Sequence, residues 1–131
     1  MKIIESLPAE RWAEYKQIKL DSITNEPIAF SEQLEKLQKK SDEDWKNDLQ
    51  NAEADRMVYV FVEDESGTLV AFANGHTHQN KRLAHNAFLS NLYVRPGARQ
   101  KGLGTQLIEK RIELLKAKYP EVKNIHCEIV T

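Results

Sequence analysis

The sequence lacks the features that mark secreted, membrane-spanning and nucleic-acid-binding proteins. Its 131 residues include one cysteine, Cys127, so no internal disulfide can form and a reducing, cytoplasmic environment is expected. No apolar run approaches the roughly 20 residues of a membrane span, and the amino terminus lacks the apolar stretch of a signal peptide. Nineteen basic and twenty acidic residues give a net charge of −1, which argues against a general nucleic-acid binder.

The composition fits a single domain that spans residues 1–131. Hydrophobic residues make up 40% of the chain and charged residues 30%, a balance that excludes a disordered tail. A domain of this size buries roughly 65–70% of the surface that its extended chain exposes, so a hydrophobic core can form. No internal repeat and no low-complexity linker interrupts the sequence, and we therefore place no domain boundary.

The charge is divided unevenly along the chain. Residues 32–65 carry a net charge of −6, and residues 95–118 carry +5. Such segments are most often solvated helix faces. The alternative is that the basic segment binds an anion while the acidic segment faces a cationic molecule.

The hydrophobic pattern predicts an α/β (α+β) domain. Its periods indicate a strand, several helices, three antiparallel strands, a long helix and a last strand. The last strand–helix–strand crossover makes the fourth and fifth strands parallel neighbours, so we expect a mixed, mainly antiparallel sheet flanked by helices. Ser41 and Asp44 are close to a capping box, and Gly75 indicates a bulge. The expected strands are 2–7, 57–62, 69–78, 86–94 and 124–130, and the helices begin near residues 8, 31, 41 and 102.

A glycine-bearing turn between the fourth strand and the long helix holds the clearest chemical signal. Backbone N–H groups at a helix start lack internal partners and lie at the positive end of the helix dipole. Gly102 and Gly104 leave room for a bulky anion to approach those groups, and Arg95, Arg99 and Lys101 add positive charge. The turn is therefore a candidate cradle for a phosphate or pyrophosphate.

Two common phosphate loops do not match this turn. A nucleoside-triphosphate loop needs Gly-Lys-Ser/Thr, whereas Gly102 is followed by Leu103 and Gly104. The dinucleotide fingerprint needs a third glycine where Leu107 stands.

The turn instead resembles the Arg/Gln-x-x-Gly-x-Gly/Ala signature of the GNAT family of N-acetyltransferases. The matching residues are Arg99-Gln100-Lys101-Gly102-Leu103-Gly104, and the preceding Leu92-Tyr93-Val94-Arg95-Pro96 resembles the family's entry from strand to loop. The predicted order of elements is also similar to the family's, so that the resemblance covers residues 2–131.

The resemblance implies acetyl-CoA, or another acyl-CoA, as the donor of an acyl group to a primary amine of a small molecule or a protein. The backbone at Leu92 and Val94, with Tyr93 between them, would pair with the pantetheine arm like an added strand. The pyrophosphate would be held by the backbone of a second set of residues: Arg99, Gln100, Lys101, Gly102, Leu103, Gly104 and Thr105.

The residues that would move protons are less clearly indicated. Many family members have a carboxylate base on the fourth strand, where this sequence has Phe88. Ser90 and Asn91 are nearby polar candidates, and Glu128 on the fifth strand is a candidate to act through water. Without any of them, a direct transfer from a free amine with water removing the proton is the remaining route.

Several other residues have weaker indications. Glu26 and Phe30 lie between the first helices, where the family usually shapes its acceptor site. His76 and His78 alternate on one strand, which predicts that both point to one face of it. We expect them to face solvent or line the acceptor site and predict no metal, since no third ligand lies near them in sequence. His85 and His126 stand alone and are assigned no role.

The family usually continues after its fifth strand with a helix and a hairpin, which we expect this chain to lack. The outer edge of the fifth strand would then be exposed, and exposed edges tend to find partners. We therefore expect a homodimer through this edge, or a chain that is a segment of a longer protein. Two alternatives to an enzyme stay open: an acyl-CoA-binding domain without activity, and an oligomerisation module without a cofactor.

Overall fold

The computed structural model describes residues 1–24, 31–52, 54–78, 80, 82–98 and 102–127. Its centre is one sheet with the strand order β1-β2-β3-β4-β5. Neighbouring strands are antiparallel except β4 and β5, which are parallel, so the expected mixed sheet is confirmed. The strands are β1 (Lys2–Ile4), β2 (Met57–Glu63), β3 (Leu69–Thr77), β4 (Asn86–Val94) and β5 (Asn124–Cys127).

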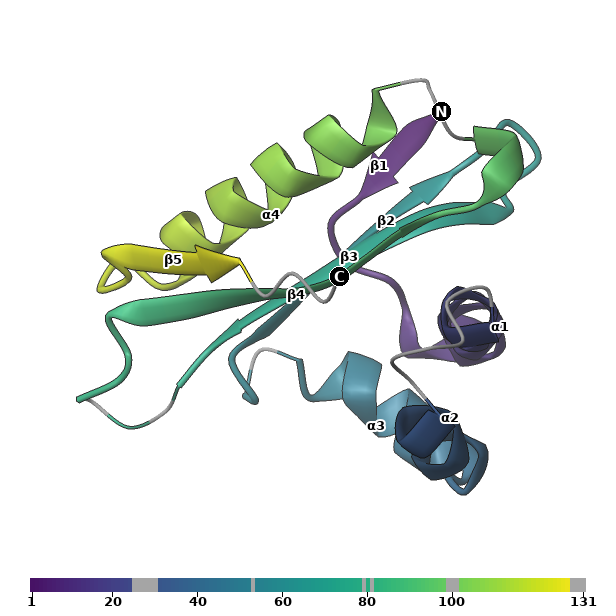
Figure 1. The fold of residues 1–131 in the computed structure, drawn as a ribbon, viewed down its shortest axis with the longest axis horizontal. Helices are drawn as coiled ribbons and strands as arrows, with labels where there is room; N and C mark the ends of the chain where they lie inside the picture. The colour runs from purple at the N-terminus through teal and green to yellow at the C-terminus, as the bar shows by residue number, and fades with distance from the viewer. Residues whose placement is uncertain (25–30, 53, 79, 81, 99–101, 128–131) are drawn as a thin grey trace.

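Helices cover both faces of this sheet. Helix α4 lies along one face, and α1, α2 and α3 lie on the other (Figure 1). None of the described helices is long and apolar enough to cross a membrane. The helical elements are η1 (Ala9–Arg11), α1 (Trp12–Thr24), α2 (Ser31–Gln38), α3 (Asp42–Gln50), η2 (Pro96–Ala98) and α4 (Leu103–Lys118), where η denotes a 3₁₀-helix.

Alternate residues of the strands supply two separate cores. In β2, Val58 and Val60 pack toward α4 with Leu107 and Leu115, while Phe61 packs on the other face with Trp45. This alternation follows from the period of two in a strand. Each fully buried side chain of this size contributes about 1.5–3 kcal/mol, so both helix layers are held chiefly by apolar burial.

The ends of several elements follow local signals in the sequence. Ser41 caps α3: its hydroxyl accepts from the Asp44 N–H over 3.2 Å, and Asp44 Oδ2 accepts from the Ser41 N–H over 3.0 Å, which confirms the capping box. The first strand ends at Ile4 rather than at Leu7, because Leu7 turns into the core on the α1 side.

The expectation of a bulge at Gly75 is wrong. Gly75 pairs regularly with Val58 and with Leu89, and the register between β3 and β4 shifts one residue earlier, between Ala73 and Asn74. A Cβ atom at Gly75 would lie 3.0 Å from Leu115 Cδ1. The glycine therefore permits close packing of α4 on the sheet, and a bulge is not needed to explain it.

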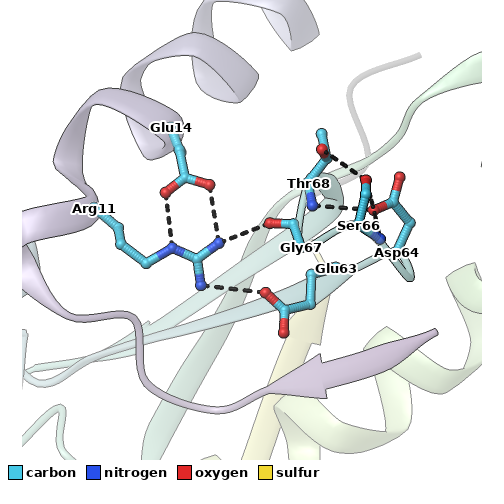
Figure 2. A network of polar contacts seen from close by, with 7 residues as sticks. All are labelled: Arg11, Glu14, Glu63, Asp64, Ser66, Gly67 and Thr68. Atoms are coloured by element: carbon cyan, nitrogen blue, oxygen red, sulfur yellow. Dashed lines mark hydrogen bonds and ion pairs between the residues drawn. The ribbon is translucent and has the colours of Figure 1, made fainter.

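A charged network joins the start of the helical layer to the β2–β3 turn (Figure 2). Arg11 donates to both carboxylate oxygens of Glu14, over 2.7 and 2.9 Å, to Glu63 over 3.2 Å and to the Gly67 carbonyl over 3.0 Å. The hydrogen bond to Glu14 and its charge raise the pKa of Arg11, and the hydrogen bond from Arg11 lowers the pKa of Glu14. Within the turn, Asp64 accepts from the N–H groups of two following residues.

Candidate functional site

Strand β4 carries an extra residue midway along its length. Asn74 of β3 pairs with Ser90, and the preceding Ala73 pairs with Leu92, which leaves Asn91 as the additional residue of β4. Such an irregularity bends a strand and changes the direction of the residues that follow it. Ser90 and Asn91, two of the predicted catalytic candidates, therefore lie at the bend; Glu128, the third, is outside the described residues.

Beyond this bend, β4 extends past the described part of its pairing with β5. That parallel pairing runs from Asn86 with Asn124 to Leu89 with Cys127, the last described residue of β5. The three predicted pantetheine-contacting residues follow. Leu92 is 43% exposed, whereas the Tyr93 side chain is buried against Phe72. Only the backbone of Tyr93 can therefore face an added molecule.

The chain then returns through η2 to a helix start that has no side-chain cap. Gly102 is the N-cap of α4 and has φ 72° and ψ 11°, the left-handed conformation that favours glycine. Chain neighbours and the backbone of the helix aside, none of the described residues has an atom within 4 Å of a Cβ placed at Gly102 or at Gly104. The first turn of α4 is therefore sterically open to an external anion, while buried Leu103 anchors it to the core.

Some of the positive charge near this turn is engaged inside the fold. Arg95 Nε donates to the Leu69 carbonyl over 3.1 Å, and its Nη1 pairs with Asp21 of α1. On α4, Lys110 pairs with Glu5, and Arg111 is buried and donates to the Asn74 carbonyl over 2.9 Å. The positive charge expected of Arg95 is therefore balanced by the carboxylate of Asp21.

Several predicted site residues cannot be placed. Arg99, Gln100 and Lys101 of the turn lie outside the described residues, as do the predicted acceptor residues Glu26 and Phe30. Thr105, in the first turn of α4, is described and exposed.

On the sheet face opposite α4, three histidine rings gather around Phe88. His76 and His126 stack on Phe88 at centroid distances of 5.4 and 5.1 Å, and His78 meets it edge-on at 5.3 Å. The prediction that His76 and His78 share a face is confirmed, since their rings are 5.9 Å apart. In the described part of the chain, no three His, Cys, Asp or Glu side chains are grouped for metal binding.

Membership of His126 in this group was not predicted. His126 is distant in sequence from the β3 histidines, and only the parallel register that places it beside Phe88 brings it there. The crossover predicts that these strands are parallel neighbours, but their register cannot be read from the hydrophobic period, because both strands follow the same alternation.

Lys19 of α1 is a second residue that sequence reasoning missed. Its Nζ lies 5.6 Å from the centre of the Phe72 ring. The Asn74 amide satisfies its neighbours when its nitrogen donates to the Ala73 carbonyl over 3.2 Å and its oxygen accepts from Lys19 Nζ over 3.1 Å. Burial, and secondarily the charge of Lys40, lower the pKa of Lys19 to about 8.

These features define a class of protein. A mixed sheet whose parallel β4–β5 pair is connected by a glycine-capped helix is the arrangement of the acyltransferases that the sequence motif resembles. A family model described as the acetyltransferase (GNAT) family matches residues 17–130. The chain belongs to this family.

Solved structures show the same fold. An acetyltransferase of the GNAT family from Streptococcus pneumoniae matches with a TM-score of 0.75 and 21% identity over 96% of this chain and 72% of its own. The PaiA N-acetyltransferase from Thermoplasma acidophilum, solved with coenzyme A, matches with a TM-score of 0.67 and 21% identity over 90% of this chain and 74% of its own. An aminoglycoside acetyltransferase from an uncultured soil metagenomic sample, solved with sisomicin, matches with a TM-score of 0.71 and 15% identity over 99% of this chain and 78% of its own. No curated protein matches the sequence.

Proposed function

We propose that this protein is an N-acyltransferase that moves the acetyl group of acetyl-CoA to a primary amine of a small molecule or a protein. One observation carries the proposal. Strand β4 extends from its last described pair with β5, at Leu89, to Val94, and the chain then leads to the open, glycine-capped start of α4. The part of β4 that follows its last described pair with β5 is thereby joined by one short connection to a helix start that would favour an anion.

The residues of this connection fit the two halves of the donor. The N–H groups of Leu103, Gly104 and Thr105 would hold the pyrophosphate with Arg99, Gln100 and Lys101, because a helix start favours an anion. The backbone of Leu92 and Val94 would pair with the pantetheine arm. When bound, acetyl-CoA supplies an acyl group activated as a thioester.

The remaining requirements for transfer concern the acceptor. A neutral amine must lie close to the thioester carbonyl, and backbone N–H groups near the bend at Asn91 would stabilise the oxyanion that develops there. The net charge of −6 over residues 32–65 favours a cationic acceptor. The aminoglycoside acetyltransferase of similar fold was solved with sisomicin, and an aminoglycoside is therefore one of the acceptors to test.

Calorimetry with acetyl-CoA tests the donor half of this proposal. We expect the wild type to bind and Gly102→Glu to lose binding, because a carboxylate would occupy the space of the pyrophosphate. Gly102→Ala is the matched control, because it shares the left-handed strain at φ 72° and adds no charge. Equal binding by the wild type and the Glu variant, or no binding by a folded wild type, would contradict the proposal.

A second candidate is an acyl-CoA-binding domain without transfer activity, which the apolar Phe88 at the family's base position favours. Release of free CoA thiol across a panel of amines separates the two. The panel should hold a small amine, an aminoglycoside, an amino acid and a peptide with a free amino terminus. Binding without thiol release would favour the second candidate. A melting temperature unaffected by saturating acetyl-CoA would instead favour an oligomerisation module, since a ligand of the native state must stabilise it.

A further inference from the structure

A row of three rings crosses β3, β4 and β5 on the sheet face away from α4. Phe88 lies between His76 and His126, with interplanar angles of 23° and 22°. The strand neighbours Ala87, Leu89 and Ile125 pack on the α4 side, so Phe88 and His126 project from the opposite face. The row therefore ends on β5 at His126, whose side chain is exposed.

Hydrogen bonds set the protonation pattern of the His126 ring. Its Nε2 lies 3.1 Å from Asn86 Oδ1, and Asn86 Nδ2 lies 3.3 Å from His85 Nε2. An amide nitrogen only donates and an amide oxygen only accepts, so His85 Nε2 accepts from Asn86 and His126 Nε2 donates to it. In the neutral ring, His126 Nδ1 then carries the free lone pair.

The proposed function needs a group that accepts a proton from the amine, and the position of His126 in the sheet suits that role. His126 pairs with Phe88, one residue before the last described pair, Leu89 with Cys127. Phe88 is the position where the family resemblance leads one to expect a carboxylate base, which a phenyl ring cannot replace. The strand next to it, however, presents an imidazole, the side chain that enzymes most often use as a base.

We propose that His126 Nδ1 accepts the proton released by the acceptor amine, and that Asn86 is a positioning residue that holds the tautomer. The inference rests on the proposed function. The amine nitrogen bonds to the thioester carbon, the carbon–sulfur bond breaks, and CoA leaves as a thiolate that takes a proton from solvent. The nitrogen's extra proton passes to His126 Nδ1, directly or through one water. The other titratable side chains around this site in the described structure are His76 and His78, which contact the same Phe88 ring, and His85, which contacts the same Asn86 amide.

The pH dependence of thiol release tests this role. His126→Gln keeps an amide that can donate to Asn86 but cannot accept the proton, and we expect kcat/KM to fall about 100-fold or more at neutral pH. The acidic limb of the wild-type pH profile should disappear in this variant. His78→Gln removes another imidazole from the same face and should keep that limb. An unchanged profile in His126→Gln would overturn the proposal.

Two further measurements separate a chemical role from a structural one. Free imidazole should restore activity to His126→Ala, and failure to do so while the variant remains folded and binds acetyl-CoA would count against the proposal. In the protein without donor, ¹⁵N NMR should show the proton of the neutral His126 ring on Nε2. A proton on Nδ1 would overturn the inference, whatever the activity. If the proposed function itself is wrong, the wild type will release no thiol, and this result is distinct from the two outcomes above.

Discussion

Gly75 of β3 lies directly against Leu115 of α4, so closely that a Cβ on the glycine would stand 3.0 Å from Leu115 Cδ1. The same Cβ would stand 3.3 Å from Val58 Cγ2 and 3.4 Å from Arg111 Cγ. Leu115 is fully buried and has little room to withdraw. This contact sets how near α4 approaches the sheet.

Enlarging Gly75 should therefore destabilise the protein. We expect Gly75→Ala to lower the free energy of unfolding by about 1 kcal/mol and Gly75→Val by about 2–3 kcal/mol, the range for overpacked cores. Urea denaturation measures both. Gly97→Ala is the control, since a Cβ there meets no atom of the described residues within 4 Å, its chain neighbours aside. A Gly75→Val protein as stable as the wild type would show that the contact is not restrictive.

The size of the side chain at Gly104 should control donor affinity without affecting the fold. A Cβ at this position has open space around it, so Gly104→Ala and Gly104→Leu should both fold, with stability equal to or above that of the wild type. Acetyl-CoA should bind to the Ala variant but bind to the Leu variant roughly tenfold or more weakly, a loss of about 1.4 kcal/mol. Calorimetry checks the difference, and equal affinities would place the pyrophosphate elsewhere.

Lys19 should make stability rise with pH between about 8 and 10. Burial lowers its folded pKa to about 8, below that of the unfolded chain, so the unfolded state binds more protons in this window. We expect a gain of about 1–3 kcal/mol, absent in Lys19→Met and retained in Lys16→Met. The denaturation measurements should be made below pH 10. Above that pH, Tyr59, whose folded pKa is raised to about 12, makes the free energy of unfolding fall as pH rises. The same rise in stability with pH in Lys19→Met would show that Lys19 is not its cause.

Removing Arg11 should weaken the junction between η1 and the β2–β3 turn. Arg11→Ala breaks ion pairs to Glu14 and to the partly buried Glu63, and we expect a loss of about 1–2 kcal/mol in urea denaturation. The exposed pair of Lys39 and Glu35, 3.9 Å apart, provides the control. Lys39→Ala should change stability by less than about 0.5 kcal/mol. Similar effects of the two variants would mean that burial of the Arg11 network adds nothing.

Local signals predicted much of this fold. The capping box at Ser41 needs only residues three apart, and the bounds of β4 follow from the turn residues on either side of one apolar run. The bend at Asn91 was not predicted, because a shift in register is a relation between two strands. A glycine within a strand can mark either a bulge or the close approach of a neighbour, and the sequence around Gly75 does not distinguish the two.

The amino-acid sequence by itself determined the order of elements, the glycine-capped start of α4 and the family to which the chain belongs, because periodicity, capping and a short motif act over neighbouring residues. Only the tertiary structure decided which residues meet on the sheet face opposite α4. The parallel register of β4 and β5 brings His126 beside Phe88 and Asn86, and packing of α1 on β3 brings Lys19 to Asn74. These contacts join residues far apart in the chain, and their chemistry depends on burial and hydrogen bonding that form only when the layers assemble.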